Sequence, residues 1–317
     1  MNRPANHAPS RDTDRDPQQS SNRPAVAFIG FGEAARAFVA GWGQDVPAEL
    51  SAYDIKTDTS GPARAAKLAD YEQAGVTGTA ALATALATAD AIFSLVTADQ
   101  AHAAASAAAK CLRPGSLFLD CNSCAPQTKE ASARLIEAAG GRYVDVAVMA
   151  PVYPLRHRAP MLVSGPHVEP ALAVLSHLGM DARDAEGPVG RASSIKLVRS
   201  IMMKGLEALA VECILAGRRL GVDDVVLASL EQTYPGFGWD ERTGQMLERV
   251  MVHGVRRAAE MDEAALMVRT LGLPAGMAEA TANWQRTVGA MNLADPSADH
   301  VTALRQRRAD AINEKLR

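Results

Sequence analysis

The stretch Ala25-Val26-Ala27-Phe28-Ile29-Gly30-Phe31-Gly32-Glu33-Ala34-Ala35 decides the fold of this chain. A short apolar run ends in Gly30-x-Gly32-x-x-Ala35 and passes directly into a helix-forming segment, Glu33 to Ala40. Gly30 permits a tight turn, Gly32 lets backbone approach a pyrophosphate, and Ala35 allows close packing of helix and strand. The helix N-terminus offers N–H groups to phosphates. The pattern indicates a dinucleotide-binding fold, although a glycine-rich turn can also be only a turn.

A second strand, Leu50-Ser51-Ala52-Tyr53-Asp54, favours the cofactor interpretation. It ends in an acid about 20 residues downstream, where a carboxylate takes both ribose hydroxyls of an adenosine. The expected cofactor is NAD, because a 2′-phosphate would meet the Asp54 carboxylate, and Lys56 and Lys67 keep NADP possible. The residues expected to contact the cofactor are Gly30, Phe31, Gly32, Glu33, Ala34, Asp54, Val96 and Thr97.

Length and composition indicate an ordinary globular protein. The 317 residues are long for one core, so two domains are expected. Hydrophobic residues make up 48% of the chain and charged residues 22%. The formal net charge of −3 gives no reason to expect nucleic acid or an anionic membrane as partner, and no apolar run is long enough for a membrane span.

The N-terminal stretch and the cysteines add two expectations. Residues 1–23 are polar and lack an apolar core, so we interpret them as a disordered tail and not as a secretory signal. Four cysteines are too few for a disulfide framework, which favours a reducing cytoplasm. Cys121-x-x-Cys124 could be half a zinc site or a redox pair. Because no second Cys or His pair lies nearby, we expect no metal and interpret both residues as small packing residues near a strand end.

Strands and helices alternate over residues 24–189. The strands expected after Asp54 are a short one near Val76, Asp90–Val96, Ser116–Asp120, Tyr143–Val148, Met161–Val163 and Asp181–Arg183. The helices expected between them are Pro62–Ala74, Ala80–Thr88, Gln100–Lys110 and Pro126–Ala139. This βαβ alternation predicts an α/β Rossmann domain, with a doubly wound, mostly parallel sheet and helices on both faces.

Residues 190–317 show only helical periodicity and are predicted to form an all-helical substrate and dimerisation domain. Its first helix, Ala192 to Leu220, carries apolar residues nearly all the way round, which is typical of a buried helix. Further helices are expected at Asp223–Glu231, from the aromatic loop 234–239 to about Ala290, and over a last amphipathic stretch from Val301 to Leu316.

Lys196 is the strongest catalytic candidate. It lies early in the predicted buried helix, just past the domain junction, where an open α/β sheet presents its cofactor edge. Arg199, Ser200 and Met203 share its helix face. Burial and the neighbouring Arg199 would lower the pKa of the amine towards neutrality, as a general acid/base requires. The alternative is a lysine that extends from a helix end into solvent.

Further candidates follow the strands. Asn122 and Ser123, after the strand that ends at Asp120, could hold a substrate hydroxyl or carboxylate, although Ser123 could equally cap the helix that begins near Pro126. Arg156 and Arg158 bracket a histidine and could clamp an acidic substrate, while a solvated loop is the commoner case. The candidate substrate contacts are Met149, Arg156, Arg158, Trp239 and His253, and we interpret His102 as a surface residue.

The order of these features resembles the β-hydroxyacid dehydrogenases, which include 3-hydroxyisobutyrate and 6-phosphogluconate dehydrogenases. The resemblance rests on the Gly30 fingerprint, Asp120-x-Asn122-Ser123-x-x-Pro126, Tyr143-Val144-Asp145 and the Gly190…Lys196 helix, and covers about Ala25 to Leu220. It implies a Rossmann domain, an all-α second domain and an active site at their junction, often completed by a partner subunit. It also implies a lysine acid/base, which maps to Lys196, and a homodimer.

The departures from the family pattern imply a divergent branch. Asp120-Cys121-Asn122-Ser123 stands where the family has Asp-x-Ser-Thr, and Ser200 replaces an asparagine one turn after the lysine. Pro151 stands within the segment whose Ser-Gly-Gly backbone usually grips a carboxylate, and it removes one N–H donor. The resemblance implies an NAD(P)-dependent oxidoreductase acting on a hydroxy/carbonyl small molecule, with Lys196, Asn122, Ser123 and Ser200 as catalytic residues. The alternatives are an imine reductase or a non-catalytic cofactor-binding regulator.

Overall fold

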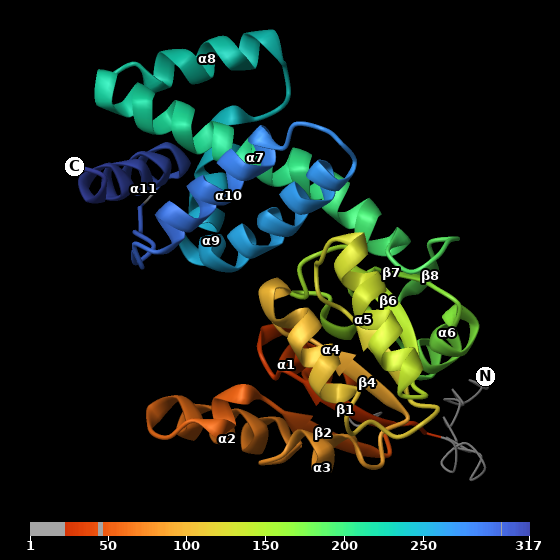
Figure 1. Ribbon diagram of the computed structural model, residues 1–317. Coiled ribbons are helices and arrows are strands. Elements are labelled where there is room, and N and C mark those ends of the chain that lie inside the picture. Colours follow the sequence, from red (N-terminus) through yellow and green to blue (C-terminus); the bar gives the residue numbers. More distant parts are fainter. Residues whose placement is uncertain (1–22, 44–46, 299) are drawn as a thin grey trace, which may run out of the picture.

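The computed structural model describes residues 23–43, 47–298 and 300–317, so all but Arg23 of the predicted N-terminal tail lies outside the described residues. A layered sheet-and-helix part comes first and a purely helical part follows it (Figure 1). The strands are β1 Ala25–Ile29, β2 Glu49–Tyr53, β3 Thr77–Gly78, β4 Ala91–Ser94, β5 Leu117–Asp120, β6 Arg142–Val148, β7 Met161–Ser164 and β8 Ala182–Asp184. This architecture confirms the predicted fold class.

The helices follow the predicted alternation closely. Those around the sheet are α1 Glu33–Trp42, α2 Pro62–Ala74, α3 Leu82–Leu86, α4 Ala101–Ala108, α5 Pro126–Ala138 and α6 Val168–His177, with short 3-10 helices η3 Ile55–Asp58, η4 Ala98–Gln100 and η5 Arg156–Arg158. We predicted no helix at α6, although Pro170 in its first turn is compatible with one. The helical part contains α7 Arg191–Leu220, α8 Asp223–Thr233, α9 Trp239–Thr270, α10 Gly276–Gly289 and α11 Val301–Lys315.

The sheet topology determines where a ligand can bind. The strand order is β3-β2-β1-β4-β5-β6-β7-β8, and all neighbours are parallel except β6 and β7. The order reverses between β1 and β4, where Ile29 is in register with Ser94. In open sheets of this kind ligands bind outside the carboxyl ends of the strands at such a switch point. The glycine turn after β1 and the loop after β4 therefore border the expected crevice.

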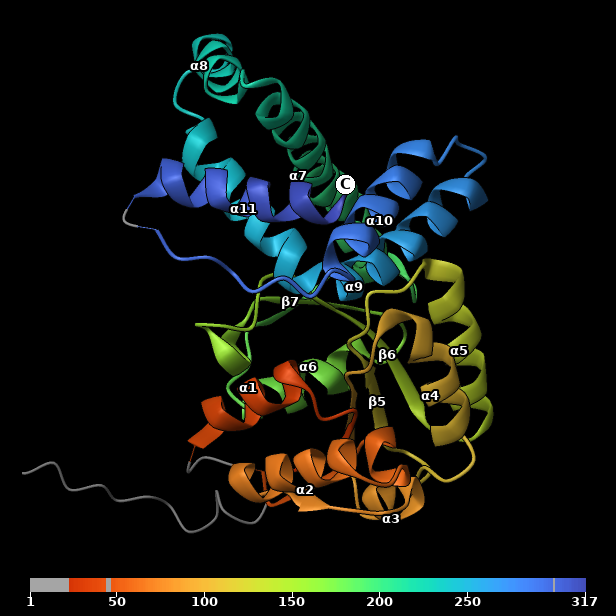
Figure 2. The ribbon, with the colours of Figure 1, turned by 90° about the vertical axis from the view of Figure 1, so that its left-hand side faces the viewer.

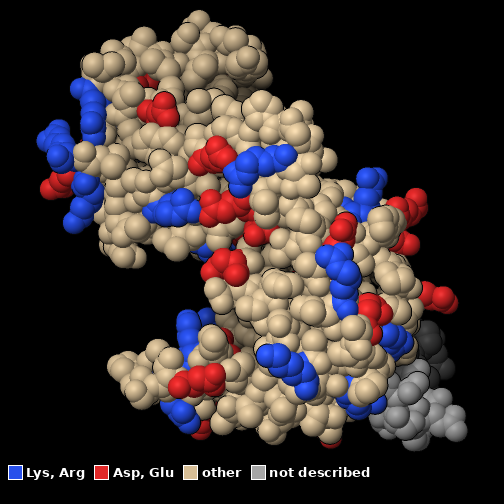
Figure 3. Space-filling view, viewed as in Figure 1, with Lys and Arg blue, Asp and Glu red and all other residues tan. Residues whose placement is uncertain are grey.

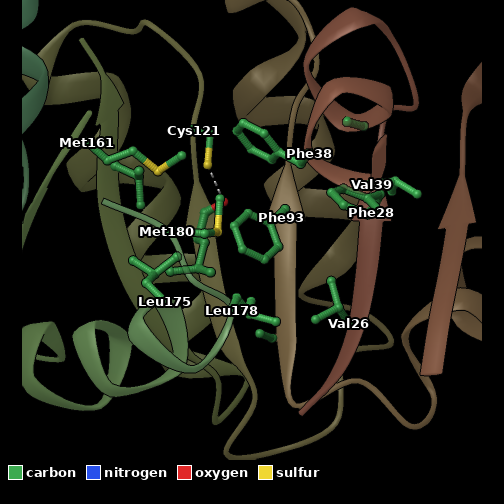
Figure 4. Close-up of a cluster of buried hydrophobic side chains, with 14 of the residues drawn as sticks. Val26, Phe28, Phe38, Val39, Phe93, Cys121, Met161, Leu175, Leu178 and Met180 are labelled. Atoms are coloured by element: carbon green, nitrogen blue, oxygen red, sulfur yellow. Dashed lines mark hydrogen bonds between the residues drawn. The ribbon is translucent and has the colours of Figure 1, made fainter. Parts of the chain in front are cut away.

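The core of the sheet part consists of aromatic and aliphatic side chains between β1, β4 and the helices on one face. Phe28 and Phe93 have ring centroids 5.7 Å apart, and Phe38 lies edge-on to Phe93 at 6.2 Å (Figure 4). Every residue of β4 is buried, as is typical of a parallel strand covered on both faces. Burial of each such aromatic side chain contributes about 1.5–3 kcal/mol, which makes these strands a rigid support for the loops at their ends.

Helix α7 departs from the prediction of burial on all sides. Its inner side packs on α9, α10 and α11, but Val198, Met202 and Leu209 are 57%, 72% and 58% exposed. The prediction was wrong for a single chain because the other helices cover only one side of α7. Figure 2 shows α7 extending from the sheet part towards α8. None of the described helices is both long enough and apolar enough to span a bilayer.

A buried arginine fixes the last helix to the helical part. The guanidinium of Arg305 on α11 is fully buried and forms ion pairs with Asp223 at 2.8 Å and Asp240 at 2.6 Å. Asp223 begins α8 and Asp240 lies in the first turn of α9, so one side chain joins three helices. The predicted apolar stripe of this helix contributes less than expected, since Val301 is exposed while Ile312 is buried.

Candidate functional site

The glycine turn has the geometry that a pyrophosphate requires. Gly30 has φ +82°, and a Cβ there would lie 2.5 Å from the carbonyl oxygen of Leu95, so only glycine fits. Around Gly32, by contrast, no described atom lies within 4 Å of where a Cβ would be. Helix α1 begins directly after Gly32, and no described side chain caps it. The start of α1 therefore has no side-chain cap and the space beside Gly32 is open, so the turn has room for a bound phosphate group.

Asp54 connects the glycine turn to β2. Its carboxylate accepts hydrogen bonds from the backbone N–H of Phe31 at 2.9 Å and of Lys56 at 3.0 Å, and the Lys67 ammonium lies 3.9 Å away. A carboxylate has about four acceptor sites, so acceptor capacity for a ribose hydroxyl is left on each oxygen. Phe31, a predicted cofactor contact, differs from expectation. Its N–H is used by Asp54 and its side chain is buried in the core, so it shapes the turn and offers no backbone donor.

Asn122 holds two strand ends together. Its amide oxygen accepts from the backbone N–H of Val96 at 2.8 Å, and its amide nitrogen donates to Ser94 Oγ at 3.0 Å and Asp120 Oδ1 at 2.7 Å. Both amide protons are engaged within the protein and the residue is only 4% exposed. Its side chain positions the loop after β4, and a contact of Asn122 with a substrate stays a prediction. Thr97, next in that loop, is exposed.

Ser123 is available for a ligand. It does not cap α5, because the N-cap residue is Ala125 and its N–H donates to the Glu263 carboxylate of α9 at 2.7 Å. Glu263 also accepts from Thr128 Oγ1 at 3.1 Å, which ties the helical part to α5. The Ser123 hydroxyl is half-buried and has no hydrogen-bond partner within the described part of the chain. Of the two interpretations made from the sequence, the capping one is wrong.

A buried lysine that we did not predict lies under the strand ends. Lys129 Nζ donates to the Asp120 carbonyl at 2.7 Å and lies 3.1 Å from the Asp120 carboxylate and 3.4 Å from that of Asp145. Burial lowers the pKa of Lys129, but the two carboxylates more than offset this and raise it above the usual value. The hydroxyl of Tyr143 donates to Asp120 at 2.6 Å. The network joins β5, α5 and β6.

The same network fixes the first turn of α7. Asp145 accepts hydrogen bonds from Ser193 Oγ at 2.5 Å and from the Gly190 and Ser193 N–H groups. Gly190 has φ +95°, and a Cβ there would lie 2.9 Å from Cβ of Pro126, so the helix start touches α5 directly. A carboxylate at a helix N-terminus is stabilising, and here it also orients the helix that carries Lys196.

Lys196 is half-buried and forms no hydrogen bond or ion pair with the described residues. Burial lowers the pKa of its amine to about 8, with Lys204, Lys129 and Arg256 adding to the effect and Glu260 opposing it. We predicted the direction correctly but the neighbour wrongly, since Arg199 is exposed and the cations that act most strongly on Lys196 are Lys204, Lys129 and Arg256. Lys196 follows Ser193 by three residues, and Ser193 bonds to Asp145 of β6, so the register of α7 places Lys196 less than one turn from this contact with the sheet.

A second ionic cluster lies about two turns further along the same face of α7. Lys204 Nζ donates to Ser200 Oγ at 3.0 Å and to the Glu260 carboxylate of α9 at 2.8 Å. Ser200, a predicted catalytic residue, is buried and its oxygen accepts from Lys204. The spacing of Lys196, Ser200 and Lys204 at i, i+4 and i+8 was the available signal, but the sequence could not show that Glu260 faces them.

The predicted arginine clamp does not assemble. Arg156 donates to the Ala40 carbonyl at 3.1 Å, near the C-terminal end of α1. Ala40 lies seven residues after Glu33, so this contact is about 10 Å along the helix from the phosphate turn. Arg158 is exposed on the same loop, as the solvated-loop alternative expects. Arg156 attaches the loop to α1, and its assignment as a substrate contact stays a prediction.

The remaining substrate candidates fall in different places. Met149 is half-buried at the carboxyl end of β6, beside the strand end that carries Ser123. His253 is half-buried on α9, two turns before Glu260 and on the same face. Trp239 instead packs on Phe237 at 4.3 Å and lines an apolar cavity of about 610 Å³ with Leu227, at the α8 end of the helical part. A substrate contact of Trp239 stays a prediction, since this cavity lies apart from the glycine turn.

The cysteines are core residues. Cys121 and Cys124 are buried free thiols, and burial raises the pKa of Cys121 to about 12. This is the packing role that the sequence suggested. Within the described residues no group of three or more His, Cys, Asp and Glu side chains could hold a metal ion.

The surface between the helical part and α2 is hollowed (Figure 3), and the glycine turn lies on this side of the sheet.

Comparison with known proteins gives matches to both the sheet part and the helical part of the chain. Residues 26–179 match the family described as the NAD binding domain of 6-phosphogluconate dehydrogenase, and residues 218–288 match a domain of unknown function, DUF1932. A conserved hypothetical protein from Sinorhizobium meliloti 1021 is 34% identical, with 95% of this chain and 99% of that chain covered and a TM-score of 0.69. The chain spans 64% of an uncharacterised Methanothermus fervidus protein, to which it is 26% identical over 53% of its own length.

More distant structures share the fold. A 3-hydroxyisobutyrate dehydrogenase from Mycobacterium tuberculosis, solved with L-serine, is 16% identical over 93% of this chain and all of that chain, with a TM-score of 0.66. A reductive aminase from Aspergillus terreus, solved with NADPH4, is 18% identical over 93% of this chain and all of that one, with a TM-score of 0.51. The chain therefore combines an NAD binding domain of the 6-phosphogluconate dehydrogenase type with a DUF1932 domain, and it belongs to the same family as the Sinorhizobium meliloti protein.

Proposed function

We propose that this chain is an NAD(P)-dependent oxidoreductase that interconverts a hydroxy and a carbonyl group on a small molecule, with Lys196 as the acid/base. The single observation that carries the proposal is that the Lys196 amine is unpaired and has a lowered pKa. It has no hydrogen-bond partner among the described residues, its pKa is lowered to about 8, and it lies less than one turn after the Ser193–Asp145 contact that fixes α7 on the sheet. A structural lysine in such a place would be paired, as Lys129 and Lys204 are.

The residues divide the work as follows. The turn at Gly32 and the start of α1 hold the cofactor pyrophosphate, and Asp54 holds the adenosine ribose. The bound nicotinamide supplies the hydride acceptor or donor. The neutral amine of Lys196 takes the hydroxyl proton in the direction of oxidation, and its ammonium form returns a proton in reduction. Ser123 and Met149, at neighbouring strand ends, supply a hydroxyl and an apolar contact to the substrate.

The proton-transfer role depends on matched acidity. Near neutral pH a lysine with its ordinary pKa stays charged and cannot accept a proton, whereas an amine with a pKa of about 8 is partly neutral. Burial lowers the pKa of the amine without a hydrogen-bond partner, so the nitrogen stays free to contact a substrate oxygen. The engaged amide of Asn122 supports the site indirectly, because it holds the Val96 loop against β5.

A substrate screen tests the proposal. The protein is incubated with NAD or NADP and a panel of hydroxyacids and polyols, and in the reverse direction with oxoacids and cyclic imines plus reduced cofactor, while absorbance at 340 nm is followed. Turnover on a hydroxy or carbonyl compound that is lost in Lys196→Ala supports the proposal. Turnover on imines alone supports imine reduction. Cofactor binding without turnover on any panel member would instead support a non-catalytic regulator.

A further inference from the structure

Lys196, Ser200 and Lys204 lie at i, i+4 and i+8 on one face of α7, and Glu260 of α9 bonds to Lys204 at this face. From α9, Glu260 and Arg256 act on the charge of Lys196; from α7, Lys204 does; and from α5, Lys129 does. The Cys121 thiol at the end of β5 also interacts with it. Lys129 is already neutralised by two carboxylates of its own. The balance around the amine is therefore set mainly by Glu260 and the cations attached to it.

Glu260 is held from both sides. Its Oε2 accepts from Lys204 Nζ at 2.8 Å, and its Oε1 accepts from Arg256 at 2.8 Å. Lys204 in turn donates to Ser200 at 3.0 Å. Glu260 and Lys204 are each less than a tenth exposed, so their charges are weakly screened by solvent. Both side chains are fixed by hydrogen bonds, which keeps a negative and a positive charge at constant positions relative to Lys196.

We propose that Glu260 and Lys204 form a positioning pair that sets how readily Lys196 releases its proton. The inference rests on the proposed role of Lys196 as acid/base. Neither residue is required to touch the substrate. Glu260 stabilises the ammonium form of Lys196 by attraction, and Lys204 destabilises it by repulsion. With both charges present, the pKa of Lys196 lies below the value that Glu260 alone would give and above the value that Lys204 alone would give.

The titration of Glu260 is consistent with a fixed charge. Burial raises the pKa of its carboxyl, but Lys204, Lys196 and Arg256 outweigh burial and lower it to about 2. The pKa of Lys204 is lowered, with burial as the main cause and Glu260 opposing it. Glu260 therefore stays ionised over the whole range in which Lys196 titrates. Only Lys196 lacks a direct partner in the cluster, and it is the group left to exchange its proton.

The test compares two single variants that remove opposite charges. Glu260→Gln removes the attraction and should move the midpoint of the Lys196 titration down by about one pH unit. Lys204→Met removes the repulsion and should move it up by about one pH unit. The double variant removes both charges and should return the midpoint towards that of the unaltered protein. Glu279→Gln, at an exposed ion pair on α10, is the matched control and should leave the midpoint unchanged.

Two measurements report the midpoint. The first is the pH dependence of kcat in the oxidation direction, with any substrate found in the screen. The second is the rate at which Lys196 is acetylated by a limiting amount of acetic anhydride as a function of pH, read by mass spectrometry of the peptide. Only the neutral amine reacts, so the second measurement needs no turnover. Shifts of opposite sign in the two single variants support the proposal.

Unchanged midpoints in variants that fold would overturn it and leave the pair a purely structural ion pair. If Glu260→Gln does not fold, Arg256→Gln replaces it as the test of the proposed pair. Arg256 is half exposed, and its removal takes away one repelling charge, so the midpoint should rise slightly. An unchanged midpoint there, together with an unchanged one in Lys204→Met, also contradicts the pairing. The labelling data separate this inference from the proposed function: turnover that survives Lys196→Ala rejects the acid/base role even where the labelling midpoint moves as expected.

Discussion

Asp145 accepts hydrogen bonds from the backbone N–H groups of Gly190 at 3.1 Å and Ser193 at 3.0 Å, so the strand β6 caps the helix that carries Lys196. Lys196 follows Ser193 by three residues, less than one turn. The same carboxylate lies 3.4 Å from the Lys129 ammonium. The position of the candidate acid/base is therefore determined by the sheet and by α5, and not by the helical part alone.

The first prediction concerns this cap. Ser193→Ala removes the hydroxyl that donates to Asp145 at 2.5 Å, and should lower the free energy of unfolding by about 1.5–3 kcal/mol because the acceptor is a buried charge. Ser194→Ala is the matched control, since the Ser194 hydroxyl bonds only to the Gly190 carbonyl of its own helix. Its cost should stay below about 1 kcal/mol. Urea denaturation of both variants measures the difference, and equal costs would contradict the capping role.

The second prediction concerns Lys196 itself. Lys196→Ala should lower kcat by about two to four orders of magnitude while the affinity for the cofactor stays nearly unchanged. Lys196→Arg should fail almost as badly, because a guanidinium does not release its proton near neutral pH. Lys110→Ala, at the exposed end of α4, is the control. Steady-state kinetics and a cofactor titration test this, and near-normal turnover in Lys196→Ala would move the acid/base role to His253 or to water.

The pH dependence of the unaltered protein follows from the same residue. The pKa of Lys196 is lowered to about 8, and oxidation needs the neutral amine. Activity in the oxidation direction should therefore rise as pH increases through about 8, and activity in the reduction direction should fall over the same range. A kcat profile that is flat between pH 6 and 10 in both directions speaks against proton transfer by this amine.

Much of the architecture could be predicted because it depends on local patterns. The Pro62–Ala74 helix was predicted to the residue, since Pro62 stands in its first turn and Gly75 ends it in the left-handed conformation. The glycine turn was equally readable, because Gly30 adopts a positive φ that few other residues tolerate.

The buried charges could not be read from local patterns. Lys129 and Glu260 are ordinary surface-type residues in an amphipathic sequence, and only the tertiary fold brings Asp120 and Asp145 to one and Lys204 to the other. The same holds for Asn122, whose amide could serve a ligand or the protein, and for Arg156, which the fold directs to α1. Pattern identifies strand ends, whereas hydrogen-bond partners far apart in sequence decide which of their side chains remain free.

The next prediction concerns cofactor choice. Asp54 ends β2 with a carboxylate held at the ribose position by two backbone N–H groups, so a 2′-phosphate should be repelled and KM should be lower for NAD than for NADP. Asp54→Ala should narrow the difference, whereas Asp58→Ala, at an exposed acid paired with Tyr53, should not. Kinetics with both cofactors measure this. A lower KM for NADP in the unaltered protein would contradict it.

The last prediction concerns assembly. Val198, Met202 and Leu209 form an exposed apolar stripe on α7, the helix that also presents Lys196, and one copy of the chain leaves it uncovered. Exposed apolar surface of this kind commonly marks an interface, so we expect the protein to be at least a homodimer, with α7 at the contact. Light scattering at micromolar concentration should give at least twice the 33.4 kDa chain mass. Met202→Glu places a charge in the stripe and should lower the measured mass, while Lys110→Glu, at an exposed turn residue just after α4, should not. A monomer mass for the unaltered protein would contradict the expectation, and a dimer that survives Met202→Glu would place the contact on another face.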